Sequence, residues 1–170
     1  PSFVGVVGGR LRKRPGALAG PAAERFAAFV ERLPQPAPHA WTGPYDLLVT
    51  GVGGTGVVTV GALIAMAAHL EANSASVLDF MGFAQKGGSV LSFVRLAKDK
   101  AALNQVRIDA QQADAVLACD VVVAASADAL QTVRRGRTRV LANRHEIPVA
   151  ESIANPDADL RIDALLDKIE

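Results

Sequence analysis

The sequence predicts an α/β domain in three layers, with helices on both faces of a mostly parallel sheet. A strand pattern over residues 45–50 runs into a glycine-rich turn, and an apolar segment of helix length follows over 57–70. Further short strand patterns then alternate with helix patterns up to residue 169. Half of the 170 residues are hydrophobic, yet only 5% are aromatic, which favours α/β layers over a β-sandwich.

The glycine-rich turn is the first candidate site. Gly51, Gly53 and Gly56 have the G-x-G-x-x-G spacing, with Gly54 as an additional glycine. We expect Gly51 to permit the turn, Gly53 and Gly54 to let a ligand approach bare backbone, and Gly56 to let the helix lie close to the strand. Unpaired amides at the helix start would favour an anion such as phosphate. The alternative is a glycine-rich turn that binds nothing.

The remaining elements alternate along the chain. Strand patterns cover residues 76–79, 89–96, 121–125 and 139–142, and helix patterns cover residues 110–118, 127–135 and 162–169. The second and third strands are too close for a crossover helix, so they can pair antiparallel and make the sheet mixed.

Ligands of open α/β sheets bind beyond the carboxyl ends of the parallel strands. We therefore expect Asp79, the helix start at Ser126 and the segment 143–146 to lie near the glycine turn. The helix over 57–70 is apolar nearly all round, and we expect it to be covered on two sides.

A separate N-terminal part precedes this domain. Residues 1–21 are rich in glycine, residues 21–33 carry one apolar stripe at helical spacing, and a proline-rich connector follows. We place an N-terminal arm, helix and connector at 1–44 and the α/β domain at 45–170. The chain starts without methionine and stops inside a helix pattern, so we expect it to be a piece of a longer protein.

Composition excludes several kinds of function. Eighteen basic residues oppose seventeen acidic ones, so there is no global electrostatic reason to bind nucleic acid. The single cysteine, Cys119, excludes an internal disulfide and a multi-cysteine metal or iron–sulfur site, and its apolar neighbours predict a buried structural thiol. We assign no metal ligands and no catalytic residues. The longest apolar run is too short to cross a bilayer, and we expect a cytoplasmic protein.

Asp79 gives the glycine turn a nicotinamide interpretation. It lies 23 residues beyond Gly56, about where a Rossmann-like domain places the acid that holds the adenosine ribose. A carboxylate that merely ends a strand at the surface is at least as common. The residues themselves thus indicate a nucleotide-like phosphate site and no particular reaction.

A family resemblance extends this interpretation. Residues 51–71, 77–97 and 119–150 resemble the gamma-type domain of 2-oxoacid:ferredoxin oxidoreductases, above all the long fused indolepyruvate ferredoxin oxidoreductases. The paired signatures are the glycine turn and a second motif, Gln85-Lys86-Gly87-Gly88. The family pattern often has glutamine in place of Thr55 and arginine in place of Lys86, and it continues beyond the end of this chain.

The resemblance implies an enzyme that decarboxylates a 2-oxoacid on thiamine diphosphate, passes electrons through iron–sulfur centres to ferredoxin and transfers the acyl group to coenzyme A. It implies that this domain packs on the thiamine domains and takes part in coenzyme A binding. The expected ligand-binding residues are Gly51, Gly53, Gly54, Thr55, Gly56, Asp79, Gln85, Lys86, Gly87 and Gly88. For the second motif, a glycine turn with a solvated lysine is an equal alternative. The other hypotheses are a free-standing NAD-binding domain and a structural module without ligand.

Overall fold

The computed structural model describes residues 21–35, 37, 40–81, 88–145 and 162–169, and the chain divides into two compact units between His39 and Ala40. In the first unit, helix α1 covers Pro21–Glu31. Its expected apolar stripe is about half exposed, with Phe26 and Phe29 at 55% and 52%. The amphipathic helix is therefore present, and its apolar face is open to solvent.

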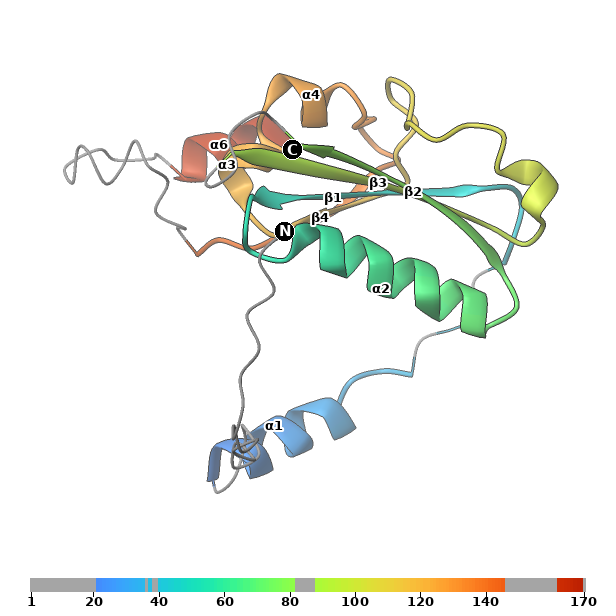
Figure 1. The fold of residues 1–170 in the computed structure, drawn as a ribbon. Helices are drawn as coiled ribbons and strands as arrows, with labels where there is room; N and C mark the ends of the chain where they lie inside the picture. The colour runs from blue at the N-terminus through green and yellow to red at the C-terminus, as the bar shows by residue number, and fades with distance from the viewer. Residues whose placement is uncertain (1–20, 36, 38–39, 82–87, 146–161, 170) are drawn as a thin grey trace, which may run out of the picture. The chain divides into compact units, whose positions relative to one another are not determined.

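The second unit contains a five-stranded sheet in the described residues (Figure 1). Its strands are β1 (Tyr45–Val52), β2 (Ser74–Met81), β3 (Ser89–Ala97), β4 (Ala115–Ala118) and β5 (Arg139–Ala142). The strand order is β2-β3-β1-β4-β5. Strand β3 is antiparallel to both of its neighbours, whereas β4 and β5 are parallel to β1. The antiparallel pairing of the second and third strands is confirmed, and the sheet is mixed.

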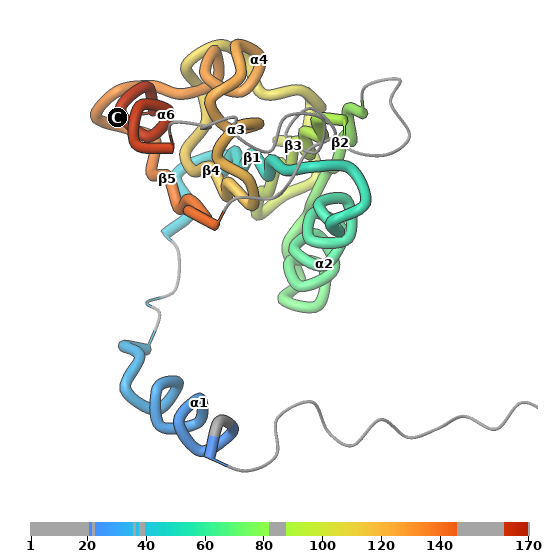
Figure 2. Tube along the Cα trace, turned by 90° about the vertical axis from the view of Figure 1, so that its left-hand side faces the viewer, coloured from blue at the N-terminus to red at the C-terminus, as the bar shows by residue number. Residues whose placement is uncertain are grey.

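Helices cover both faces of this sheet, which confirms the three-layer α/β class (Figure 2). Helix α2 (Val57–Leu70) packs on one face against β1, β2 and β3. The other face carries α3 (Val121–Ala124), α4 (Ala127–Leu130) and α6 (Ile162–Ile169). A short 3₁₀ turn, Lys100–Ala102, follows β3.

The alternation of side chains along the strands produces two cores. Leu48 and Phe93 point toward α3 and α4, whereas Val49 and Val94 point toward α2. All four side chains are at most 1% exposed. The sheet is thus buried on both faces at its centre, as the apolar composition requires.

Two sequence expectations are wrong in the segment 110–125. The expected helix over 110–118 contains strand β4, and the expected strand over 121–125 is helix α3. The physical reason is Asp120, whose Oδ1 accepts a 2.9 Å hydrogen bond from the N–H of Val123 and caps the helix. A buried valine run fits strand and helix alike, so the cap decides. Helix α4 begins after Ser126 as expected, with Ser126 Oγ accepting from Ala129 N, but it ends at Leu130.

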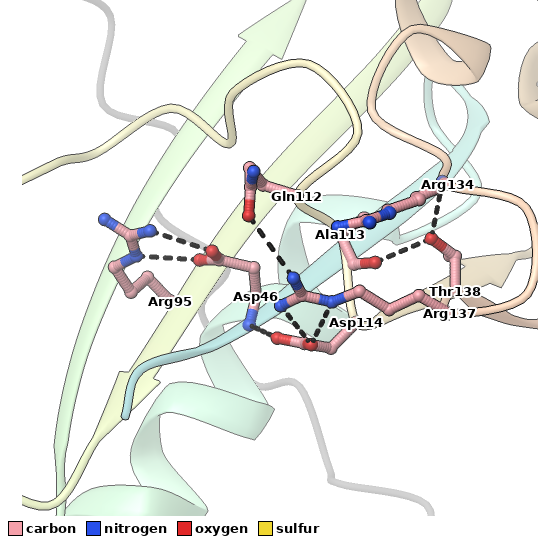
Figure 3. Close-up of polar contacts among 8 residues, drawn as sticks. All are labelled: Asp46, Arg95, Gln112, Ala113, Asp114, Arg134, Arg137 and Thr138. Carbon is pink, nitrogen blue, oxygen red and sulfur yellow. Dashed lines mark hydrogen bonds and ion pairs between the residues drawn. The ribbon is translucent and has the colours of Figure 1, made fainter. Parts of the chain in front are cut away.

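A polar network holds the sheet together at the strand ends far from the glycine turn (Figure 3). Asp46 is 4% exposed and receives two hydrogen bonds from the guanidinium of Arg95, at 2.7 and 2.8 Å. The backbone N–H of Asp46 donates to Asp114, which in turn binds Arg137. The pKa of Arg95 is raised, mainly by its hydrogen bonds to Asp46. This network joins β1, β3 and β4 where β1 and β4 begin.

Among the helices of the described residues, none combines the length and the apolar character needed to cross a bilayer.

Candidate anion site at the glycine turn

The glycine turn leaves β1 at Val52 and enters α2 at Val57. Gly54 and Gly56 have φ angles of +90° and +93°, which side-chain-bearing residues rarely adopt. Thr55 turns its hydroxyl inward and donates a 2.6 Å hydrogen bond to the carbonyl of Val52. Gly54, Thr55 and Gly56 together shape the turn that the motif predicts.

The glycine turn meets Gly88, the last residue of the second signature, in the structure. The N–H of Gly53 donates a 2.7 Å hydrogen bond to the carbonyl of Gly88. A Cβ at Gly53 would lie 3.3 Å from that carbonyl oxygen, tighter than an ordinary contact. The close backbone approach of Gly53 is therefore to Gly88. Gln85, Lys86 and Gly87 lie outside the described residues, and their assignment stays a prediction.

The start of α2 is open to a ligand. Its N-cap is Gly56, so no side chain at the cap accepts hydrogen bonds from the first-turn amides. A pocket of about 670 Å³ lies against this turn. Its lining combines the turn, the first turn of α2 and the facing strand ends: Val52, Gly53, Gly54, Gly56, Val57, Val58, Thr59, Met81, Ser89 and Val90. The 14-residue helix adds partial positive charge, so the pocket suits an anionic group.

Two glycines have other roles than the motif suggested. Gly51 lies within β1, where a Cβ would stand 2.5 Å from Cγ2 of Val57. It therefore gives room to the first residue of α2 and does not line the pocket. A Cβ added at Gly56 would meet no described atom within 4 Å. Glycine is therefore favoured at this position by the positive φ angle, and not by close packing of the helix on the strand.

The close approach of helix and sheet occurs at Gly61 instead. A Cβ there would collide with Oγ of Ser92, and Gly61 itself is buried. Gly61 lies outside the G-x-G-x-x-G spacing, and only its place within an apolar helix could have drawn attention to it.

Asp79 does not join the glycine turn. It lies in β2, and β3 separates β2 from β1. Its side chain lines a second cavity, along the middle and the end of α2, and the pocket at the turn does not include it. Met81, at the carboxyl end of β2, lines the turn pocket, and the sequence interpretation did not select it.

Ser126 and the segment 143–146 were the other residues expected near the glycine turn, and none of the described ones lines its pocket. The loop after β4 carries Asp120 at the sheet edge, and Ser126 comes only after the further helix α3. Asn143 follows β5 and ties it to the β4 loop, because its Nδ2 donates to the carbonyl of Cys119. Cys119 is only partly buried, whereas the sequence predicts a buried thiol, and this burial raises the pKa of the thiol.

Comparison with known proteins assigns this architecture to a family. Residues 46–165 match the family described as pyruvate ferredoxin/flavodoxin oxidoreductase. The chain belongs to this family, which confirms the resemblance found in the sequence.

Individual relatives are similar over part of their length. The indolepyruvate oxidoreductase subunit IorB of Thermococcus kodakarensis is 36% identical over 55 residues, which are 32% of this chain and 27% of that protein. Two solved structures are also similar. The pyruvate oxidoreductase subunit PORC of Thermotoga maritima has a TM-score of 0.46 at 17% identity, over 66% of this chain and 55% of that one. The gamma subunit of a keto/oxoacid ferredoxin oxidoreductase from Geobacter sulfurreducens has a TM-score of 0.39 at 22% identity, over 58% and 60%.

Proposed function

We propose that this chain is the gamma-type domain of an indolepyruvate-like 2-oxoacid:ferredoxin oxidoreductase, and that its glycine turn binds a phosphate of coenzyme A. Family membership and the local similarity to an indolepyruvate oxidoreductase subunit support the first part. In this proposal thiamine diphosphate, bound by other domains, supplies the decarboxylation chemistry. Ferredoxin accepts the electrons of the complete enzyme.

The observation that carries the coenzyme A part is the uncapped start of α2 beside the 670 Å³ pocket. The first-turn amides of α2 offer donors to a phosphate, and Gly53 and Gly54 carry no side chain that would hinder its approach. The N–H of Gly53 itself is bonded to the carbonyl of Gly88. Such a site orients the cofactor and performs no bond cleavage itself. The chain has a single cysteine, so clusters that need four thiolates do not fit this chain and would be held elsewhere in the enzyme.

Substitution of Thr59 tests the anion site. Thr59 is exposed, lines the pocket and is the third residue of α2, where a glutamate can accept hydrogen bonds from the helix start. We expect Thr59→Glu to keep or raise the denaturation midpoint while it weakens coenzyme A binding in titration calorimetry at least tenfold. Thr59→Gln, with the same shape and no charge, is the control and should bind nearly as the unchanged chain. Equal affinities for all three would contradict the site.

The nicotinamide alternative has less structural support. A ribose-binding acid follows the strand next to β1 in the dinucleotide-binding fold, whereas here the neighbour of β1 is β3 and Asp79 lines another cavity. NAD titrated beside coenzyme A separates the two proposals. Tight NAD binding that Asp79→Ala abolishes would favour the dehydrogenase-like interpretation, and binding of neither compound would favour the purely structural module.

The proposal also makes this chain dependent on its partners. With no residue assigned to catalysis, the 170 residues alone should not reduce viologen or ferredoxin with any 2-oxoacid and coenzyme A. Turnover by the purified chain would refute the gamma-domain assignment.

Lys86→Ala, outside the described residues, is expected to change ligand or partner contact and to leave the free energy of unfolding within about 0.5 kcal/mol of that of the unchanged chain.

A further inference from the structure

A second cavity, of about 710 Å³, lies between α2 and the edge strand β2. Its volume is in the range of small-molecule sites, roughly 300–1,000 Å³. Small side chains keep it open, with Ala62 and Ala65 on the helix and Ala75 on the strand. The close contact of Gly61 with Ser92 sets the helix against the sheet at the same level.

A carboxylate with one unpartnered oxygen lines this cavity. Asp79 lines it, and Oδ1 of Asp79 is buried with no hydrogen-bond partner among the described residues. Asp79 pairs in register with Ser92, whose Oγ is also buried and without a partner in this part of the chain. Residues opposite each other in a sheet share a face, and Ser92 contacts α2, so the carboxylate lies on the α2 side. A buried carboxylate oxygen is costly unless a donor meets it.

The rest of the lining has a definite charge pattern. Lys100 and His69 are exposed residues of the lining, so they lie at the mouth of the cavity. The ion pairs of the described residues join Asp46 to Arg95, Asp114 to Arg137 and Arg144 to Asp163, which leaves Asp79 and Lys100 uncommitted. The other lining residues are apolar at Met66, Val77, Leu103 and the alanines, and polar at Asn73 and Ser74.

We propose that this cavity binds a free amino acid with an apolar side chain. Its ammonium group would donate to Asp79, its carboxylate would lie toward Lys100 and His69, and its side chain would pack on Met66 and Leu103. A charged donor is the strongest partner for a buried carboxylate, which favours an ammonium over a hydroxyl group. The inference is independent of the proposed function, because it uses another cavity and none of the glycine turn.

Titration calorimetry on the full chain tests the site, with L-leucine and L-phenylalanine as probes. 4-Methylpentanoate, which lacks the ammonium group, and 3-methylbutylamine, which lacks the carboxylate, are the matched analogues of leucine. We expect at least one of the two amino acids to bind. If leucine binds, both of its analogues should bind at least tenfold more weakly than leucine does. Asp79→Asn should weaken amino-acid binding at least tenfold, and Lys100→Ala should weaken it several-fold. Asp109→Asn, at an exposed position away from the lining, should change nothing.

Several outcomes would overturn the proposal. These are no binding of either amino acid, affinity for 4-methylpentanoate equal to that for leucine, and amino-acid binding unchanged by Asp79→Asn. Adenosine monophosphate that binds in an Asp79-dependent manner, in place of the amino acids, would equally refute it by assigning the cavity to a nucleotide. The Thr59→Glu variant separates the two sites, because it should lose coenzyme A and keep the amino acid.

Discussion

The N–H of Gly53 and the carbonyl oxygen of Gly88 are joined by a 2.7 Å hydrogen bond. This bond links the turn after β1 to Gly88, which precedes β3 and is the last residue of the second signature. Because β1 and β3 pair up to Val52 and Ser89, the bond continues their ladder by one step beyond the sheet. The geometry of the anion pocket therefore depends on Gly88 as well as on the glycine turn.

The first prediction is that Gly53→Ala destabilises the chain by about 1–3 kcal/mol, the usual cost of overpacking. The added Cβ would lie 3.3 Å from the carbonyl oxygen of Gly88, and backbone cannot yield as a flexible side chain can. Denaturant unfolding measures the cost. Gly43→Ala is the control, because a Cβ there meets nothing within 4 Å, and its midpoint should stay close to that of the unchanged chain. Equal midpoints for both variants would show that the Gly53–Gly88 contact is not tight.

The extent to which sequence reveals this site depends on the kind of interaction. Strand, turn and helix over 45–70 could be predicted, since periodicity and glycine spacing are local signals. The roles of individual glycines could not, because they depend on contacts made only in the folded chain: Gly51 meets Val57, and Gly61 meets Ser92.

Asp79 and the segment after residue 110 show the same limit. The distance of Asp79 from Gly56 along the chain suggested a common site, but the insertion of β3 between β2 and β1 separates them. The valines after Asp120 carry no periodicity that distinguishes strand from helix. Only recognition of Asp120 as a helix cap could have corrected the assignment.

The second prediction concerns Gly61. Gly61→Ala should destabilise the chain although alanine is the better helix former, because its Cβ would collide with Oγ of Ser92. We expect the free energy of unfolding to fall by about 1–2 kcal/mol, because the cost of overpacking exceeds the gain from the higher helix propensity of alanine. In the double variant with Ser92→Ala, the collision is relieved and most of the lost free energy of unfolding should be recovered. Thermal or denaturant unfolding of the single and double variants completes the cycle, and strictly additive effects would show that these residues do not touch.

Comparison with Gly56 sharpens this test. No described atom lies within 4 Å of a Cβ at Gly56, so Gly56→Ala should cost only the strain of its positive φ angle, about 1–2 kcal/mol. Ser92→Ala should not relieve that cost. Relief at both glycines would mean that Ser92 acts on overall stability and not on one contact.

The third prediction is that Arg95→Met is strongly destabilising, by about 3 kcal/mol, because it leaves the buried carboxylate of Asp46 without its bidentate partner. Arg137→Met is the matched control. Its ion pair with Asp114 is more exposed, at 41% and 20% of the two side chains, and should contribute less than about 1 kcal/mol. Unfolding curves at neutral pH compare the two. A similar small loss for both would show that Asp46 is readily solvated when Arg95 is removed.

The pair substitution Asp46→Leu with Arg95→Met extends this prediction. Removing both charges removes the unpaired carboxylate, so the double variant should recover most of the stability lost in Arg95→Met. The N–H of Asp46 that donates to Asp114 belongs to the backbone and is kept. Failure to recover would indicate that the ion pair itself stabilises this edge of the sheet.

The last prediction concerns the outer face of α2, which was expected to be covered. One side of the helix packs on the sheet, but Leu63 and Leu70, outside the lining of both cavities, are 64% and 79% exposed. In the proposed function this apolar face packs on other domains of the parent enzyme. Leu63→Lys should therefore leave the free energy of unfolding of the isolated chain within about 0.5 kcal/mol. In the complete enzyme it should lower 2-oxoacid-dependent viologen reduction by impairing assembly. Val106→Lys, at an exposed apolar position outside this helix, is the control and should leave both quantities unchanged. Full activity and normal assembly of Leu63→Lys would show that this face of α2 is not the docking surface.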